Sequence, residues 1–186
     1  MLSRVQSVIR SAILRIEAHN PTRTGHAERT SSYAVATAHE LGLHENALLS
    51  VRVAAALHDI GRLLIPRDLL ERPDAISSEE RNQIRASSTL GAESVLRLGT
   101  ENSLDFSDAA LFIGQRFSPL VDQNLGAKVL HVCSAFDTMT TSQPWREAKP
   151  EEAAMTELEI HGSEFDPSVV AAFKKVQPLI VPITIR

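Results

Sequence analysis

The chain has 186 residues, of which 43% are hydrophobic, so it is long enough to bury one sizeable core, and no low-complexity linker divides it. A formal net charge of −4 predicts no broad cationic surface, so we expect neither nucleic acid nor an anionic membrane as a partner. The single cysteine excludes an internal disulfide framework, and no apolar run approaches the roughly 20 residues of a membrane span, which together favour a soluble cytoplasmic protein.

Hydrophobic periodicity and capping signals predict an all-α bundle of about seven to nine helices. Residues 1–20 should form an N-terminal helix that packs on a single domain, residues 21–176. Residues 177–186 contain Pro178 and Pro182 among β-branched residues, which indicates an extended C-terminal tail. The segments expected to be helical are 2–18, 22–41, 45–58, 67–70, 78–98, 107–117, 125–141, 150–159 and 167–175.

Two helix starts carry clear capping signals. The Ser77 hydroxyl can accept from the Glu80 amide while the Glu80 carboxylate reaches back to the Ser77 amide, which is a capping box. Asp166 is a good N-cap, and Pro167 after it suits the first turn of a helix. These signals fix where two of the helices should begin.

Adjacent His58 and Asp59 are the most informative pair, because they follow the apolar helical run 54–57 and precede the basic Arg62. A neutral imidazole and a carboxylate both ligate divalent metals, and at a helix end both can be aimed at one ion. Two ligands hold a metal poorly, so further ligands must come from other helices. Taken alone, the pair is as compatible with an ordinary polar helix terminus.

His26, in Gly25-His26-Ala27-Glu28-Arg29, lies one predicted helix upstream of this pair, and with it the chain resembles the HD superfamily. More specifically, it resembles the HD-GYP family of cyclic di-GMP phosphodiesterases over about residues 22–173. The motifs that carry the resemblance are His26 with Arg29, Leu41-Gly42-Leu43, Ala55 to Gly61, Ile65-Pro66, Ser78-Glu79-Glu80, Gly91, Phe136 to Thr140, Pro144-Trp145-Arg146, Glu151-Glu152-Ala153 and Phe165 to Val170.

The resemblance implies a compact HD-domain helical bundle with His26, His58 and Asp59 as metal ligands. Arg62 replaces the family's lysine after the His-Asp pair and is a candidate phosphate-binding residue. The signature loop that names the family is deleted, and side chains without ligand groups stand at its other ligand positions. These positions are Thr22, Ser87, Ile113, Gly114 and Ser134. We therefore expect no binuclear site.

The favoured interpretation is a degenerate, catalytically inactive domain that acts as a signalling or regulatory binding module in bacterial cyclic-dinucleotide signalling. It would need no cofactor, and its partner would be a protein or a second copy of the chain, with the region 115–124 as a groove left by the missing loop. A related alternative is a sensor that binds cyclic di-GMP through Arg62 and other cations without cleaving it.

The runner-up interpretation is a metal-dependent phosphohydrolase, a phosphodiesterase with one divalent ion of zinc, iron, manganese or nickel at His26, His58 and Asp59. His131 lies three residues before Ser134 on the same predicted helix, so it could complete that mononuclear site. His131 is otherwise expected to fill the emptied space as a neutral polar side chain.

Overall fold

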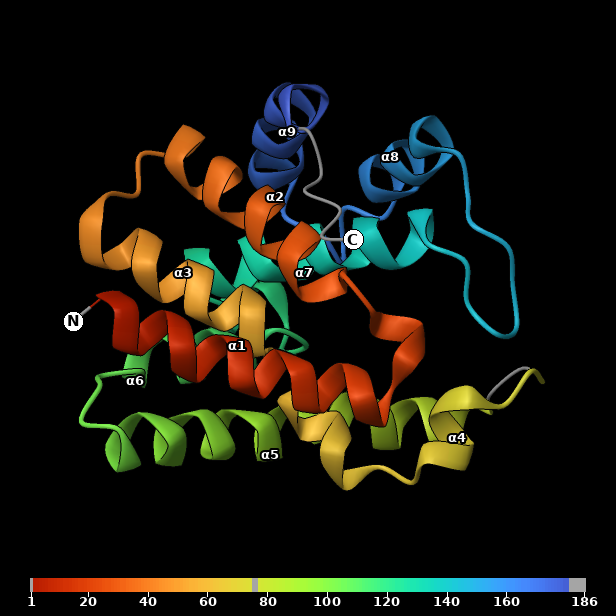
Figure 1. Ribbon diagram of the computed structural model, residues 1–186. Helices are drawn as coiled ribbons and strands as arrows, with labels where there is room; N and C mark the ends of the chain where they lie inside the picture. The colour runs from red at the N-terminus through yellow and green to blue at the C-terminus, as the bar shows by residue number, and fades with distance from the viewer. Residues whose placement is uncertain (1, 75–76, 181–186) are drawn as a thin grey trace.

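The computed structural model describes residues 2–74 and 77–180, which form nine α-helices, four short 3-10 helices and no strand (Figure 1). The predicted all-α class is confirmed. The α-helices are α1 Leu2–His19, α2 His26–Glu40, α3 Glu45–Leu57, α4 Arg67–Glu71, α5 Ser78–Glu101, α6 Ser107–Gln115, α7 Leu125–Thr140, α8 Glu151–Ile160 and α9 Pro167–Val176. The 3-10 helices are η1 Pro21–Arg23, η2 Ile60–Leu64, η3 Leu120–Asp122 and η4 Gln177–Leu179.

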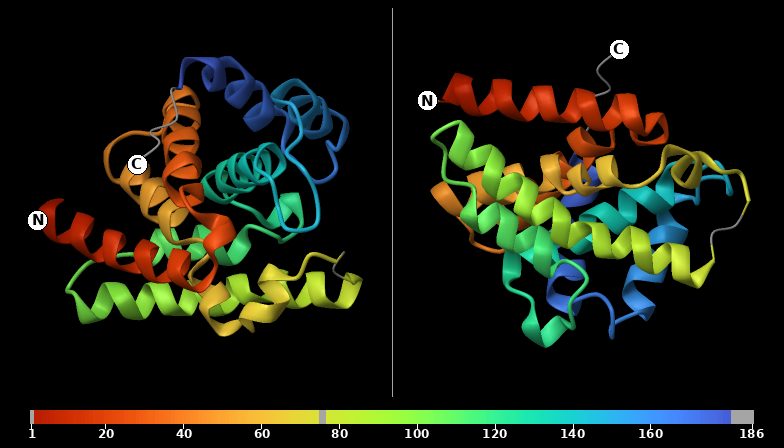
Figure 2. Two further views of the ribbon diagram at one scale, coloured as in Figure 1. Left: turned by 45° about the vertical axis from the view of Figure 1, so that its right-hand side comes forward. Right: turned by 90° about the horizontal axis from the view of Figure 1, so that it is seen from below.

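Helix α7 lies at the centre of the bundle and packs against α2, α3, α6, α8 and α9 (Figure 2). A helix that is apolar on all sides belongs in a core, and Leu130, Cys133 and Phe136 of α7 are fully buried. Tyr33 of α2 and Phe173 of α9 pack edge-on against Phe136, with ring centroids 5.7 and 4.9 Å from it. Polar residues on α7 are therefore carried into the interior.

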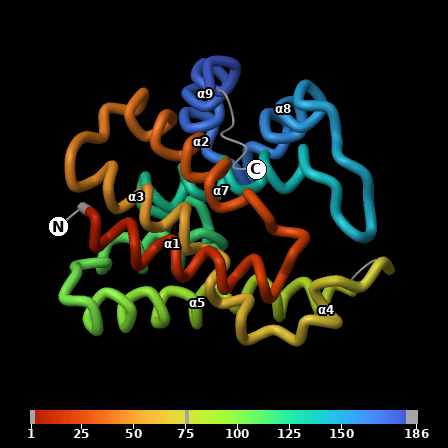
Figure 3. Tube along the Cα trace, in the orientation of Figure 1, coloured from red at the N-terminus to blue at the C-terminus, as the bar shows by residue number. Residues whose placement is uncertain are grey.

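The other helices enclose α7 from two sides, with α8 and α9 on the side opposite α5 (Figure 3). Helix α1 buries Val5, Ala12, Ile13 and Ile16, and it packs against α3, η1 and η2. Helix α5 packs against α6 and η2. Within the described part of the chain, no helix is both long and apolar enough to cross a lipid bilayer.

The first helix of the domain begins later than predicted. Helix α2 starts at His26 and not at Thr22, because Gly25 adopts φ 73°, a left-handed conformation that stops a helix from running through it. The preceding residues form η1 instead. His26 therefore stands in the first turn of α2.

The described part of the tail also differs from the prediction. Gln177–Leu179 form the 3-10 helix η4 and are not extended, because the fixed φ of Pro178 is compatible with a helical turn. The remainder of the predicted tail, residues 181–186, lies outside the described residues. The two predicted caps are confirmed: Ser77 and Glu80 form a reciprocal capping box, and Asp166 accepts from two amides of α9.

Helix α5 meets η2 with no side chain between their backbones. A Cβ added at Gly61 would lie 1.9 Å from the carbonyl oxygen of Ser87 and 3.0 Å from the amide nitrogen of Gly91. Only glycine allows this approach. Because η2 follows Asp59 directly, the contact fixes the end of α3 against α5.

Candidate functional site

Three predicted ligands, His26, His58 and Asp59, converge in the interior. Their donor atoms all lie within 4.8 Å of one another, and all three residues are buried. Nε2 of His26 lies 3.0 Å from Nε2 of His58. Asp59 places Oδ1 3.4 Å from His58 Nε2 and Oδ2 3.8 Å from His26 Nε2. Since nitrogen and carboxylate ligands lie about 2.0–2.2 Å from a bound zinc, donors at these separations can reach one ion.

Hydrogen bonds fix which nitrogen of each ring carries the proton. Nδ1 of His58 lies 2.8 Å from the carbonyl oxygen of Ala55, which can only accept, so this nitrogen donates. Nδ1 of His26 lies 2.6 Å from Oδ2 of Asp137. Burial would raise the pKa of Asp137, but hydrogen bonds from His26 and Arg29 outweigh burial and lower it, so the carboxylate accepts. Both neutral rings therefore carry their lone pair on Nε2.

Two Nε2 lone pairs that face each other across 3.0 Å cannot hydrogen-bond without a cation. A proton is disfavoured there, because burial lowers the pKa of His26 and holds that of His58 well below its usual range. In addition, Oδ2 of Asp59 is buried and has no hydrogen-bond partner among the described residues. The three side chains therefore fit a divalent metal ion.

Asp137 also pairs with Arg29, one turn beyond His26 on α2. Nε and Nη2 of Arg29 lie 2.6 and 3.0 Å from the two carboxylate oxygens. A carboxylate bonded to the second nitrogen of a ligating histidine fixes the orientation of its ring. The Arg29 and Asp137 pair is thus the support that aims His26 at the other two donors.

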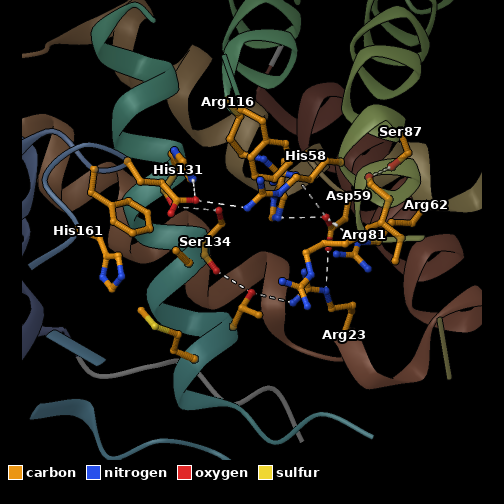
Figure 4. A pocket seen from close by; sticks show the side chains of 18 of the residues that line it. Arg23, His58, Asp59, Arg62, Arg81, Ser87, Arg116, His131, Ser134 and His161 are labelled. Atoms are coloured by element: carbon orange, nitrogen blue, oxygen red, sulfur yellow. Dashed lines mark hydrogen bonds and ion pairs between the residues drawn. The ribbon is translucent and has the colours of Figure 1, made fainter. Parts of the chain in front are cut away.

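Three arginines surround Asp59 (Figure 4). Nε of Arg23 lies 2.9 Å from Oδ2, although the approach is not aligned for a hydrogen bond, and Nε of Arg62 lies 3.0 Å from Oδ1. Nη2 of Arg116 lies 4.0 Å from Oδ1. Burial opposes ionisation of Asp59, but the charges of Arg23 and Arg62 outweigh it and hold the pKa of the carboxyl well below its usual range.

The arginines stand at one end of a cavity of about 350 Å³. Across it lie His131 and His161 (Figure 4). The wall also includes the apolar rings of Trp145 and Phe165. The cavity thus has a cationic end beside the three converging donors and an opposite wall with apolar surface.

At two positions that line this cavity, the resemblance leads us to expect a metal ligand but the chain has a serine. Ser87 and Ser134 line it, but their hydroxyls donate to the carbonyl oxygens of Ile84 and His131 in their own helices, at 2.7 and 3.3 Å. Ile113 is fully buried in the core. None of these side chains offers a charged or imidazole ligand.

His131 lies outside the group of three converging donors. Its ring packs between Phe117 and Phe165, with centroids 5.4 and 4.8 Å away. Burial, together with the charges of Arg116 and Arg85, lowers the pKa of His131 to about 3. Its service as a fourth ligand stays a prediction.

Sequence reasoning identified Arg62 but missed Arg23 and Arg116. Arginine is rarely buried, and nothing in the sequence distinguishes these two from surface arginines. The only signal for Arg116 is its place beside the region where the family's signature loop is deleted. Arg23 directly follows Thr22, one of the positions where the family's acidic ligand is replaced.

The sequence is similar to proteins of established families. The sequence profile of the HD domain matches residues 11–115, more than half of the chain. A cyclic di-GMP phosphodiesterase of Thermotoga maritima is 29% identical over 172 residues, which cover 85% of this chain and 45% of that protein. A cyclic di-GMP phosphodiesterase response regulator of Xanthomonas campestris pv. campestris is 30% identical over 158 residues, 78% of this chain and 41% of that protein. The chain spans less than half the length of these two relatives.

A solved structure has the same fold. An HDG"Y"P protein from Bdellovibrio bacteriovorus superposes with a TM-score of 0.65 at 19% identity, covering 82% of this chain and 51% of that one. The fold, the convergence of His26 with the His58-Asp59 pair and the profile match agree with one another, and the resemblance predicted from the motifs is confirmed. The chain therefore belongs to the HD domain family.

Proposed function

We propose that this HD domain is a regulatory module that binds a phosphate-containing ligand, of the kind on which its cyclic-dinucleotide phosphodiesterase relatives act, and that it does not perform two-metal hydrolysis. The observation that carries the proposal is the makeup of the cavity: arginines stand where phosphate would bind, while Ser87 and Ser134 offer no metal ligand. Two-metal hydrolysis needs ligands for ions about 3.5–4 Å apart, and the described residues bring together one set of three donors.

In contrast to the expectation of a module without a cofactor, one divalent ion fits His26, His58 and Asp59, and when bound it would supply a Lewis acid for a phosphate oxygen. The chain's own residues do the rest. Asp137 holds the His26 ring, Arg23 and Arg62 hold the Asp59 carboxylate, and the guanidinium groups bind phosphate oxygens. Such a module would pass on ligand binding to a protein partner or to a second copy of the chain.

A second candidate is a phosphohydrolase with a single ion of zinc, iron, manganese or nickel. The specific observation in its favour is the pair of Nε2 lone pairs 3.0 Å apart, which calls for a cation between the two histidines. It differs from the first candidate in turnover and not in ligand binding.

The two candidates are separated by measuring metal content, binding and turnover on one preparation. We expect calorimetry to detect cyclic di-GMP binding, chromatography to detect no hydrolysis with any of the four metals, and elemental analysis to find one ion that is lost in His58→Ala. His39→Ala, which removes an exposed histidine of α2, is the matched control. Metal-dependent hydrolysis that His58→Ala abolishes would overturn the module in favour of the enzyme. Absence of binding and of hydrolysis would reject both for this dinucleotide.

A further inference from the structure

Arg116 is buried at the cationic end of the cavity with its hydrogen-bonding capacity unused. Its side chain is 7% exposed, and it donates no hydrogen bond to any of the residues that the structure describes. Its nearest carboxylate oxygen is Oδ1 of Asp59 at 4.0 Å, and its guanidinium carbon lies 4.3 Å from the centroid of the Phe117 ring. Its Nε is buried and has no partner among the described residues, and a buried donor left unpaired is costly.

Asp59 cannot neutralise this arginine, because Arg23 and Arg62 already pair with it at 2.9 and 3.0 Å. Among the described residues, no other carboxylate lies within 4.0 Å of any of the three arginines. Three guanidinium groups therefore share one carboxylate, which leaves an excess of two positive charges. A divalent ion on the neighbouring histidines would increase that excess.

We propose that the cationic end of the cavity recognises a terminal phosphomonoester, with Arg116 as the residue that selects it over a phosphodiester. This inference rests on the proposed function because it uses the same phosphate site. It predicts that cyclic di-GMP, whose two phosphates are both diesters, binds there more weakly than a ligand with a terminal phosphate. A phosphomonoester carries about two negative charges at neutral pH and three free oxygens, so it offsets more of this positive excess and offers more acceptors to the guanidinium groups than a diester does. A phosphodiester carries one charge and two free oxygens. The apolar rings of Trp145 and Phe165 cover the organic part of the ligand.

The proposal predicts an opposition between stability and binding at Arg116. An apolar side chain of similar length would remove the cost of burying a charge that lacks a hydrogen-bond partner. Arg116→Met should therefore unfold at a higher temperature than the parent chain without phosphate, yet lose phosphate affinity. An arginine kept only to support the fold through Asp59 would give the reverse, since its removal would lower the unfolding temperature.

Calorimetric titration with methyl phosphate and dimethyl phosphate at about pH 8, where the monoester is fully ionised, tests the selection. We expect methyl phosphate to bind about tenfold more tightly, because it offers the guanidinium groups one more charged oxygen than dimethyl phosphate does. Arg116→Met should lose this preference, Arg116→Lys should keep part of it through its charge, and Arg52→Met should keep all of it. Arg52 is an exposed arginine of α3 that does not line the cavity.

Equal affinity of the parent chain for the two probes, or an undiminished preference in Arg116→Met, would overturn the inference. Arg116→Lys guards against loss of folding as the cause, because it retains the cation. The outcome is separate from that of the proposed function. Hydrolysis of cyclic di-GMP would reject the module while leaving methyl phosphate selection intact, whereas cyclic di-GMP binding without that selection would reject the inference alone.

Discussion

The imidazole of His26 donates from Nδ1 to Oδ2 of Asp137 across 2.6 Å, which joins the first turn of α2 to the C-terminal half of α7. Arg29 holds the same carboxylate through two nitrogens. The central helix of the bundle thus sets the position of His26. The pair of Arg29 and Asp137, which bonds neither His58 nor Asp59, sets the direction in which Nε2 of His26 points.

This relationship predicts the effect of Asp137→Asn. The amide cannot accept both His26 and Arg29 with a full negative charge, so the His26 ring loses its fixed orientation. We expect the affinity for a divalent ion to fall about 10–100-fold, as measured by calorimetric titration with zinc or manganese. Asp122→Asn, which removes an exposed carboxylate from η3, serves as the control. Unchanged metal affinity in Asp137→Asn would show that orientation of His26 does not govern the site.

His131 predicts a pH dependence of stability. Its pKa falls from 6.5 to about 3 on folding, chiefly through burial, so the unfolded chain binds a proton that the folded chain refuses. Stability is therefore full above pH 6.5 and is lost as the pH falls toward 3. Between pH 7 and pH 5, this one group should cost about 2 kcal/mol of the free energy of unfolding.

Urea unfolding of the parent chain and of His131→Leu at the two pH values measures this contribution. Between pH 7 and pH 5, the free energy of unfolding of His131→Leu should fall by about 2 kcal/mol less than that of the parent chain. Any contribution from the other buried histidines is the same in both proteins. If the free energy of unfolding changed by the same amount in the variant and in the parent chain, the pKa of His131 would not be lowered by folding. Metal content of the same variant tests the predicted fourth ligand, since an undiminished content would exclude His131 from that role.

Two glycine substitutions should have opposite effects on stability. Gly61→Ala places a methyl group against the Ser87 carbonyl, so we expect a loss of about 2–4 kcal/mol. Gly114 lies in α6, and a Cβ there would meet only the Ala92 side chain of α5 at 3.6 Å. Because alanine is the better helix former, Gly114→Ala should gain about 0.5–1 kcal/mol. Thermal and urea unfolding compare the two. Tolerance of Gly61→Ala would argue against the direct contact between η2 and α5.

The capping box of α5 gives a smaller effect. The Glu80 amide donates to the Ser77 hydroxyl at 3.2 Å, and Ser77→Ala leaves that amide without its partner. We expect a loss of about 1 kcal/mol in the free energy of unfolding. Ser94→Ala, inside the same helix, should cost less because its hydroxyl bonds a carbonyl that the helix already satisfies. Equal losses would contradict a specific role for the cap.

The fold was largely predictable because its helices start and end at local signals. Ser77 and Asp166 act on the amides of the next few residues, so their effect is readable from the sequence. The predicted start of α2 was wrong because a glycine is compatible with either sign of φ, and only the packing around Gly25 selects 73°. The prediction of an extended tail was wrong for Gln177–Leu179 for a similar reason, since Pro178 allows both an extended chain and a turn.

The candidate site was predictable to the extent that residue type decides its chemistry. His26, His58 and Asp59 were recognisable as candidate ligands, and they do converge. The roles of Arg23 and Arg116 depend on burial beside Asp59, which arises from contacts between segments far apart in the chain. The hydrogen bond from His26 to Asp137 spans 111 positions, so neither the ring orientation nor its support follows from local sequence.

The backbone contact at Gly61 and Gly91 has a mechanical consequence. Flexible side chains between two helices can absorb a small relative movement, but none lies between η2 and α5 at this contact. A tilt of α5 therefore moves the backbone that follows Asp59, and it also moves Arg81 and Arg85, which α5 contributes to the cavity. A ligand that draws Asp59 or these arginines inward should therefore also shift α5, because the contact transmits movement in both directions.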